Sequence, residues 1–275
     1  MAVERNRPKS PWVTKALLVI VLVLLYLPIA VMLGGAVTEK IDGQVSLTLR
    51  WLGEVFSDPQ LMGALQNSLV VAVATSLLAT SLGTLGALAL HSSSRKMKLA
   101  MNSLSLVSLI FPEIVFALSL LSLFFILRFE LGLVTVVIAH VSFSISYVMM
   151  TVNARLASLD PAIEDAARDL GASEWVIIRT VVLPLLKPAI AGGFILSFLL
   201  SFDDFLITYF VNGVGRDTLP VKLYTAMKMG ISPKLNALSS VMFLITVVAL
   251  IFFFRSSAFR VLLEGQRRND GEKDR

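Results

Sequence analysis

The sequence contains no cysteine, only two histidines and few charged residues. Without cysteine the chain forms neither a disulfide framework nor a thiolate metal site. His91 and His140 lie in different apolar segments, so we expect interfacial packing rather than metal binding. Charged residues make up 16% of the chain, against about 25% in soluble domains. Because the deficit is concentrated in long apolar segments, the sequence predicts an integral membrane protein.

The chain also lacks the motifs of common nucleotide-binding and catalytic sites. There is no G-x-x-x-x-G-K-[ST] phosphate loop, so ATP binding by that device is excluded. The H-E-x-x-H and G-x-S-x-G motifs are missing too, and no nucleophile is paired with a base. We therefore expect no catalytic residue and no cofactor on this chain. If ATP drives it, the ATPase is another polypeptide.

The apolar segments predict an all-α fold with six transmembrane helices in a membrane domain spanning 16–254. A basic tail, 1–15, precedes an apolar run longer than the core of a signal peptide, so we expect it to be an uncleaved span. Residues 255–275 form a charged tail. We expect a short amphipathic surface element within 38–65. The spans are expected at about 16–37, 67–90, 99–127 (interrupted at Pro112–Glu113), 133–153, 188–211 and 237–254.

Small residues recur along the second predicted span at Ala79, Gly83 and Ala87. A spacing of four places them on one face of a helix, where they let neighbouring backbones approach closely. We therefore expect this span to be buried in the bundle, although an alanine-rich helix facing lipid is the alternative.

The distribution of basic residues predicts the orientation in the membrane. Six spans place both ends on one side, and the four segments on that side carry 17 of the 24 Lys and Arg residues. Because basic residues accumulate in cytoplasmic segments, we expect both termini in the cytoplasm. The loop 212–236 is an exception, since it carries four basic residues on the opposite side.

A polar island at 154–186 separates the fourth and fifth predicted spans. It predicts two short helices on the cytoplasmic side. Asp160 is a suitable N-cap for the first, and Gly171 can adopt the left-handed conformation that ends it. We expect Ser173 to begin the second helix and Pro184 to close it.

A pair of helices around a glycine also raises the possibility of a DNA-binding helix-turn-helix. The second helix, 174–183, is nearly all apolar and carries Arg179 as its one basic residue, so we expect no nucleic-acid partner. The first helix has small residues, Ala166 and Ala167, within a charged rim. This composition favours a helix presented to a protein partner, with the second helix packed on the bundle.

Carboxylates inside the predicted membrane spans have two interpretations. Asp203 and Asp204 lie roughly 12 Å from the outer end of the fifth span, where ionised groups are costly unless paired or facing water. Either one caps or pairs with a neighbouring helix, or at least one faces a water-filled path and attracts a cation. Glu113 has the same two interpretations. Candidate aromatic faces for an amine, or simple packing residues, are Phe202, Phe205, Tyr209, Phe143 and Tyr147.

The polar island resembles the EAA motif of permease subunits of bacterial ABC importers. The matching residues are Glu164-Asp165-Ala166-Ala167, then Gly171 and the downstream Leu183-Pro184. Asp165 replaces the usual first glutamate. The resemblance implies the type I ABC importer permease fold, in which a coupling helix docks on the ATPase subunit. It assigns that docking role to Glu164, Asp165, Ala166, Ala167 and Gly171.

Further segments resemble the spermidine/putrescine permeases. They are Trp51, Asn67-Ser68, Ser201-Phe-Asp-Asp-Phe205, Thr218-Leu-Pro220, Tyr224 and Gly230–Leu238. This resemblance implies a polyamine substrate, a bacterial inner-membrane location and three kinds of partner: ABC ATPase subunits, a sister permease in a hetero-pair and a periplasmic substrate-binding protein. The alternatives are an ABC permease for another small solute and an ion-coupled secondary transporter that uses Asp203, Asp204 and Glu113 as ion carriers.

Overall fold

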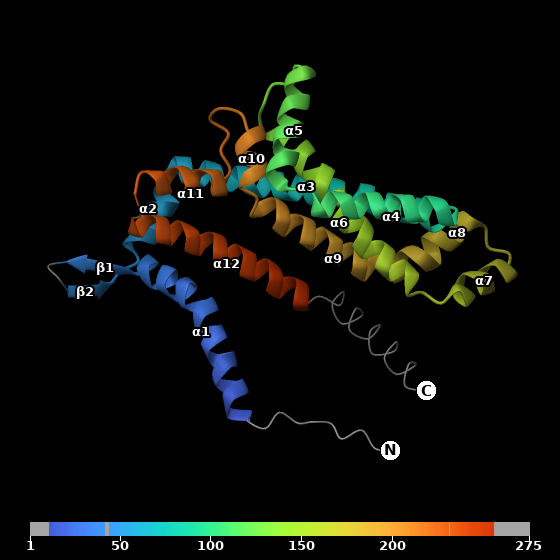
Figure 1. The fold of residues 1–275 in the computed structure, drawn as a ribbon, viewed down its shortest axis with the longest axis horizontal. Helices are drawn as coiled ribbons and strands as arrows, with labels where there is room; N and C mark the ends of the chain where they lie inside the picture. The colour runs from blue at the N-terminus through green and yellow to red at the C-terminus, as the bar shows by residue number, and fades with distance from the viewer. Residues whose placement is uncertain (1–10, 42–43, 231, 256–275) are drawn as a thin grey trace. The chain divides into compact units, whose positions relative to one another are not determined.

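The computed structural model describes three stretches of the chain, residues 11–41, 44–230 and 232–255 (Figure 1). The outer parts of the two predicted tails, 1–10 and 256–275, lie outside the described residues. The chain divides into two compact units, of which one contains 1–58 with 226–243 and the other contains 59–225 with 244–275.

Five described helices are long and apolar enough to cross a membrane: Trp12–Ala36, Pro59–His91, Leu133–Ala157, Glu174–Phe202 and Pro233–Phe252. The predicted third span differs from the rest. It is divided into α4 (Arg95–Ile110) and α5 (Glu113–Ile126). The 14 residues of α5 rise about 21 Å, which is less than the ~30 Å hydrocarbon core.

The division of the third span follows from Pro112. A proline disfavours helical backbone in the residue before it, and Phe111 accordingly has a ψ of 132°. The helix α5 starts at Glu113, the residue after Pro112. The interruption predicted at Pro112–Glu113 is therefore confirmed, and it separates two helices.

The smaller unit holds the expected amphipathic element, α2, and a hairpin that the sequence patterns did not predict. The hairpin pairs Thr38 with Leu47 and Ile41 with Gln44. Its strands have four residues each, too few for a clear alternation of apolar and polar positions. The indole Nε1 of Trp51 donates to the Thr38 carbonyl at 3.1 Å. The elements of this unit are α1 (Pro11–Ala36), β1 (Thr38–Ile41), β2 (Gln44–Leu47), α2 (Arg50–Ser57) and the first part of α12 (Pro233–Arg255).

The larger unit is built around three long helices, α3, α6 and α9, each of which packs on the other two (Figure 1). The helix α5 packs on α10, and α4 packs on α6. The elements that begin in this unit are α3 (Pro59–His91), α4, α5, α6 (Leu133–Ala157), α7 (Pro161–Asp169), α8 (Glu174–Ile177), η1 (Ile178–Val182), α9 (Leu183–Phe202), α10 (Leu206–Val211) and α11 (Leu219–Lys228).

Small residues allow α6 to lie close to both α3 and α9. A Cβ atom added at Gly83 of α3 would lie 2.8 Å from the Val148 Cβ of α6, and one added at Gly193 of α9 would lie 3.2 Å from the Val148 Cγ1. Ala79 and Ala87 are fully buried on the same stripe as Gly83. The prediction that this span lies inside the bundle is therefore confirmed.

The predicted end of the second short helix at Pro184 is wrong. The short helix α8 continues through the π-helical turn η1 into α9, so that Glu174–Phe202 is one helical segment. Proline normally interrupts a helix because it lacks an N–H and clashes with the carbonyl four residues earlier. Here the π-helical turn η1 directly precedes α9, and its wider turn changes the hydrogen-bond register just before Pro184, so the helical segment continues past the proline.

Candidate functional site

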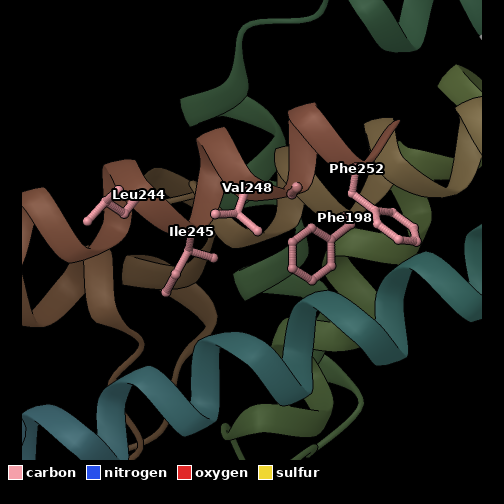
Figure 2. A pocket seen from close by; sticks show the side chains of 6 residues that line it. Phe198, Leu244, Ile245, Val248 and Phe252 are labelled. Carbon is pink, nitrogen blue, oxygen red and sulfur yellow. The ribbon is translucent and has the colours of Figure 1, made fainter. Parts of the chain in front are cut away.

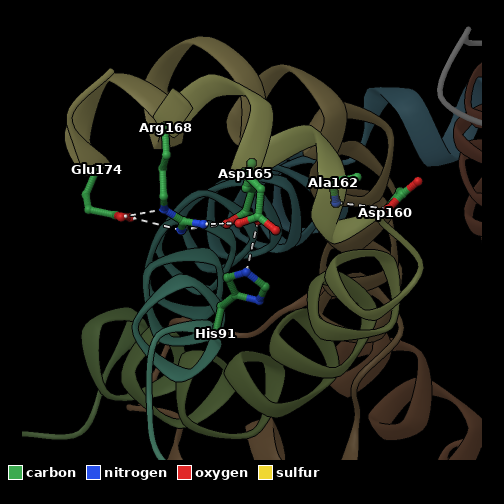
Figure 3. Close-up of polar contacts among 7 residues, drawn as sticks. His91, Asp160, Ala162, Asp165, Arg168 and Glu174 are labelled. Atoms are coloured by element: carbon green, nitrogen blue, oxygen red, sulfur yellow. Dashed lines mark hydrogen bonds and ion pairs between the residues drawn. The ribbon is translucent and has the colours of Figure 1, made fainter. Parts of the chain in front are cut away.

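The first helix of the polar island, α7, is bounded by the residues predicted from the sequence. The side chain of Asp160 accepts a hydrogen bond from the Ala162 N–H at 2.9 Å (Figure 3), and Pro161 is the first helical residue. At the other end Gly171 has a φ of +83°, a conformation that glycine adopts without steric cost. The Ala172 N–H then donates to the Ala167 carbonyl at 3.1 Å. These contacts confirm the predicted caps.

The polar island exposes its first helix and buries part of its second. No residue of α7 is buried, and the adjoining Leu170 and Trp175 are 89% and 67% exposed. In contrast, Ile177 and Val182 are buried in the core cluster that α3, α6 and α9 form. The prediction of a presented helix held by an apolar second helix therefore agrees with the structure.

Arg168 connects the two halves of this loop. Its guanidinium lies 2.8 Å from Asp165 and 3.4 Å from Glu164 on its own helix, and 2.9 Å from Glu174 at the start of α8 (Figure 3). The hydrogen bond and charge of Glu174 raise the pKa of Arg168 above its ordinary value. One cation therefore contacts three carboxylates and links α7 to the start of α8.

Glu164 also contacts the end of α3. Its Oε1 lies 3.1 Å from the His91 Nε2, and the Glu164 side chain is only 17% exposed. The neighbouring Asp165 side chain is 68% exposed, and Ala166 is exposed while Ala167 is half-buried. Glu164 therefore ties α7 to a long helix, whereas Asp165 and Ala166 are available to a partner.

We expect Arg168→Gln to weaken coupling between ATP hydrolysis and transport by a few-fold. The substitution removes the charge that holds Asp165 and Glu174 together, and exposed ion pairs contribute modestly. Raising the salt concentration should reproduce part of the loss in the unsubstituted protein by screening the same charges. The measurement is solute uptake per ATP hydrolysed in proteoliposomes.

The matched control is Arg179→Gln. Arg179 is exposed in the adjoining turn η1 and has no ion pair within the described part of the chain. Equal losses in the two variants would contradict a specific role for Arg168.

A second candidate site lies where the fifth predicted span breaks. We expected Asp203 and Asp204 to lie within one continuous span. Instead, α9 ends at Phe202 and α10 begins at Leu206, so both aspartates lie between two helices. The side chain of Asp204 accepts from the Thr208 N–H at 2.8 Å, which satisfies a free donor at the start of α10. Non-helical backbone at membrane depth is tolerated where it is buried in protein or lines a cavity.

The three predicted carboxylates have different surroundings. Asp204 is 7% exposed, whereas Asp203 and Glu113 are exposed in the isolated chain. Glu113 is the first residue of α5, and α5 packs on α10, which begins two residues after Asp204. The fold thus brings Glu113 to the helix break, from a segment 90 residues earlier in the chain.

His140 is a site residue that we did not predict. It is fully buried rather than interfacial. Its Nδ1 lies 2.7 Å from the Ser201 Oγ and its Nε2 lies 2.9 Å from the Asp204 Oδ2. The sequence did contain an indication of this role. His140 is an ionisable residue within an apolar span, and such a residue usually has a polar partner inside the bundle.

Three aromatic rings lie just beyond the break. The Phe205 ring centroid is 5.4 Å from that of Tyr209 and 4.5 Å from that of Tyr224 in α11, and the two tyrosine centroids are 5.8 Å apart. Tyr209 is 46% exposed. A partly exposed aromatic ring can contact an ammonium group.

The other three predicted aromatic residues are in packed positions. Phe202 is 1% exposed and stacks on Phe198 with centroids 5.8 Å apart. Tyr147 and Phe143 are half-buried and meet edge-on at 6.2 Å. All three rings contribute packing in the isolated chain.

A groove of about 420 Å³ lies between Phe198 of α9 and the second part of α12 (Figure 2). Its lining is entirely hydrocarbon and comprises Phe198, Leu244, Ile245, Val248, Ala249 and Phe252. A charged solute would find no polar partner there, so the groove is separate from the carboxylates at the helix break.

Comparisons with known proteins identify the family. Residues 79–267 match the family described as the inner membrane component of binding-protein-dependent transport systems. The chain is 36% identical over 229 residues to the spermidine/putrescine transport system permease protein PotC of Escherichia coli strain K12, covering 82% of this chain and 87% of that one. It is also 36% identical over 198 residues to the putrescine transport system permease protein PotI of the same strain, covering 70% of each chain.

A solved structure supports the same fold. A chain of a bacterial ABC transporter involved in the import of the acidic polysaccharide alginate superposes with a TM-score of 0.66 at 16% identity, covering 93% of this chain and 96% of that one. At this identity the likeness concerns the fold alone. Together with the family match and the membrane-spanning helices, it shows that the chain belongs to the family of inner membrane permease components of binding-protein-dependent ABC importers.

Proposed function

We propose that this chain forms part of the translocation path of an ATP-driven importer for polyamines. The relatives whose names state spermidine and putrescine transport support the substrate class. The polar island, residues 154–186, is the proposed coupling loop. It supports the proposal that a separate ATPase subunit drives transport, because α7 is exposed and is fixed to α3 through Glu164.

The observation that carries the proposal is the group of carboxylates at the helix break. Asp203 and Asp204 lie in the break, and Glu113 begins α5, which packs on α10 directly after the break. Ionised carboxylates at this place attract a cation and repel an anion such as phosphate or sulfate. A polyamine carries several ammonium groups, and the partly exposed Tyr209 beside the break provides a further contact for one of them.

The proposed assembly contains three kinds of partner. A sister permease pairs with this chain and the path runs between them, in a hetero-pair. An ABC ATPase subunit docks on α7, where Asp165, Ala166 and Leu170 are exposed. A periplasmic binding protein delivers the solute to the outer loops. Both termini lie in the cytoplasm, which is the orientation that the basic residues favour. Alternating access then opens the path outward and inward in turn.

The test is uptake by the complete complex in proteoliposomes, with labelled putrescine, labelled spermidine and labelled sulfate as the anionic control. We expect uptake of at least one amine, dependent on both ATP and the binding protein, and no uptake of sulfate. Failure of both amines to enter the vesicles or to stimulate ATP hydrolysis would refute the polyamine proposal. Uptake that persists without the ATPase but stops when ionophores collapse the ion gradients would favour the secondary transporter instead.

A further inference from the structure

We propose that His140 is a positioning residue which, through Asp204, holds the break between α9 and α10 so that Asp203 is the carboxylate facing the solute. The inference rests on the proposed function, because it divides roles within the proposed cation path. It assigns a structural role to Asp204 and a solute-facing role to Asp203.

His140 joins both sides of the helix break. From α6 its ring reaches Ser201 in the last turn of α9 (2.7 Å), Asp204 in the break (2.9 Å) and Thr208 in the first turn of α10 (3.1 Å). All four residues are buried. A buried polar network that satisfies its members fixes one arrangement, because any other leaves a polar group without a partner.

Oδ2 of Asp204 accepts several hydrogen bonds within the protein, and its Oδ1 accepts from the Ile207 N–H at 3.4 Å. Its Oδ2 accepts from the N–H and the hydroxyl of Thr208, at 2.8 and 2.7 Å. The same Oδ2 of Asp204 also accepts a hydrogen bond from the His140 Nε2–H. In the neutral imidazole the other nitrogen, Nδ1, is then an acceptor, and it accepts the hydrogen bond of the Ser201 hydroxyl. The Asp204 side chain is 2% exposed. A solute ammonium would therefore have to displace existing hydrogen bonds to reach it.

Asp203 is placed differently, although it is the adjacent residue. Its N–H still donates to the Leu199 carbonyl at 3.1 Å as the end of α9, and its side chain is exposed in the isolated chain. The backbone leaves the helix at the next residue. Because the next residue is the one that His140 holds, the direction of the Asp203 carboxylate depends on the His140–Asp204 contact.

A double-mutant cycle in the complete reconstituted complex tests this dependence. We expect His140→Ala to lower the maximal rate of polyamine uptake by about tenfold, the effect of losing one hydrogen bond to a charged group. Asp203→Asn should lower it by a similar factor. In the Asp203→Asn background, His140→Ala should cause less than about a twofold further loss, because residues that act through one another are not additive. Losses that multiply would overturn the inference.

Conservative substitutions separate positioning from general stability. The side-chain amide of glutamine lies near the place of the histidine Nε2, and that of asparagine lies near Nδ1. His140→Gln, which keeps a donor toward Asp204, should therefore retain more uptake than His140→Asn, at equal thermal stability of the two complexes. Equal uptake, or more uptake with asparagine, would overturn the inference. This comparison decides the matter if His140→Ala does not assemble.

The two aspartates provide the remaining comparison. Asp204→Asn keeps an acceptor oxygen for His140 and Thr208, so uptake should remain within about threefold of the unsubstituted complex, whereas Asp204→Ala removes the acceptor and should abolish most of it. Asp203→Asn and Asp203→Ala should be equally poor. If Asp204→Asn is as poor as Asp204→Ala, Asp204 contacts the solute and the inference fails. If the unsubstituted complex takes up neither amine, the proposed function itself fails, which is a separate result.

Discussion

Gly171→Val is expected to uncouple ATP hydrolysis from transport while leaving the protein inserted in the membrane. Gly171 has a φ of +83°, and a left-handed conformation costs an L-residue about 1–2 kcal/mol, more for a β-branched side chain. Since 1.4 kcal/mol is about a tenfold change in population, the ratio of molecules with the present turn between α7 and α8 to molecules without it should fall about tenfold. The measurement is uptake together with ATPase activity stimulated by the loaded binding protein.

The matched control is Gly171→Asn. Asparagine adopts the left-handed conformation more readily than other non-glycine residues, and a Cβ atom at this position meets no atom within 4 Å. The asparagine variant should therefore keep most of the coupling. Normal transport by the valine variant would show that the backbone conformation at this turn is not required for the docking of α7.

Gly83→Ala is expected to destabilise the larger unit by about 1–3 kcal/mol, the usual effect of overpacking a well-filled interior. The added Cβ would lie 2.8 Å from the Val148 Cβ and 3.1 Å from the Ile145 carbonyl oxygen. Neither atom is the end of a flexible side chain, so α3 and α6 must move apart. The effect should appear as a lower midpoint of thermal unfolding in detergent and a lower yield of folded protein.

Gly63→Ala on the same helix is the control for this substitution. No atom lies within 4 Å of a Cβ placed at Gly63, and replacing glycine by alanine inside a helix stabilises it by up to about 1 kcal/mol. The two substitutions are chemically identical, yet we expect changes of opposite sign. Equal stability of the two variants would mean that Gly83 is not needed for the close approach of α3 and α6.

The coupling loop was predictable because its structure depends on local rules. Asp160 caps α7 with its own side chain, and Gly171 takes the conformation that few other residues tolerate. The apolar composition of 174–183 likewise predicted that this helix packs on the bundle. These features depend on residues only a few positions apart, and such interactions are encoded in the local sequence.

Predictions from the local sequence were wrong where a residue type is compatible with more than one backbone structure. Pro184 is a strong helix terminator by composition, but the helical segment continues past it after the π-helical turn η1. The pair Asp203 and Asp204 was placed within one continuous span, which is wrong because α9 ends at Phe202. The alternative that one of them caps or pairs with a neighbouring helix is confirmed for Asp204. The sequence alone does not indicate which structure a residue adopts, since the choice depends on the neighbouring helices.

The sequence by itself determined that the chain is a mostly helical membrane protein with an exposed helical loop, because hydropathy and capping depend on residue type and short spacing. Only the tertiary structure decided how the polar residues inside the membrane pair with one another. It brought His140 from α6 to Ser201 and Asp204, which lie 61 and 64 residues later, and left Asp203 exposed. Two adjacent and chemically identical carboxylates differ only in what packs against them, and that packing is set by contacts between distant segments.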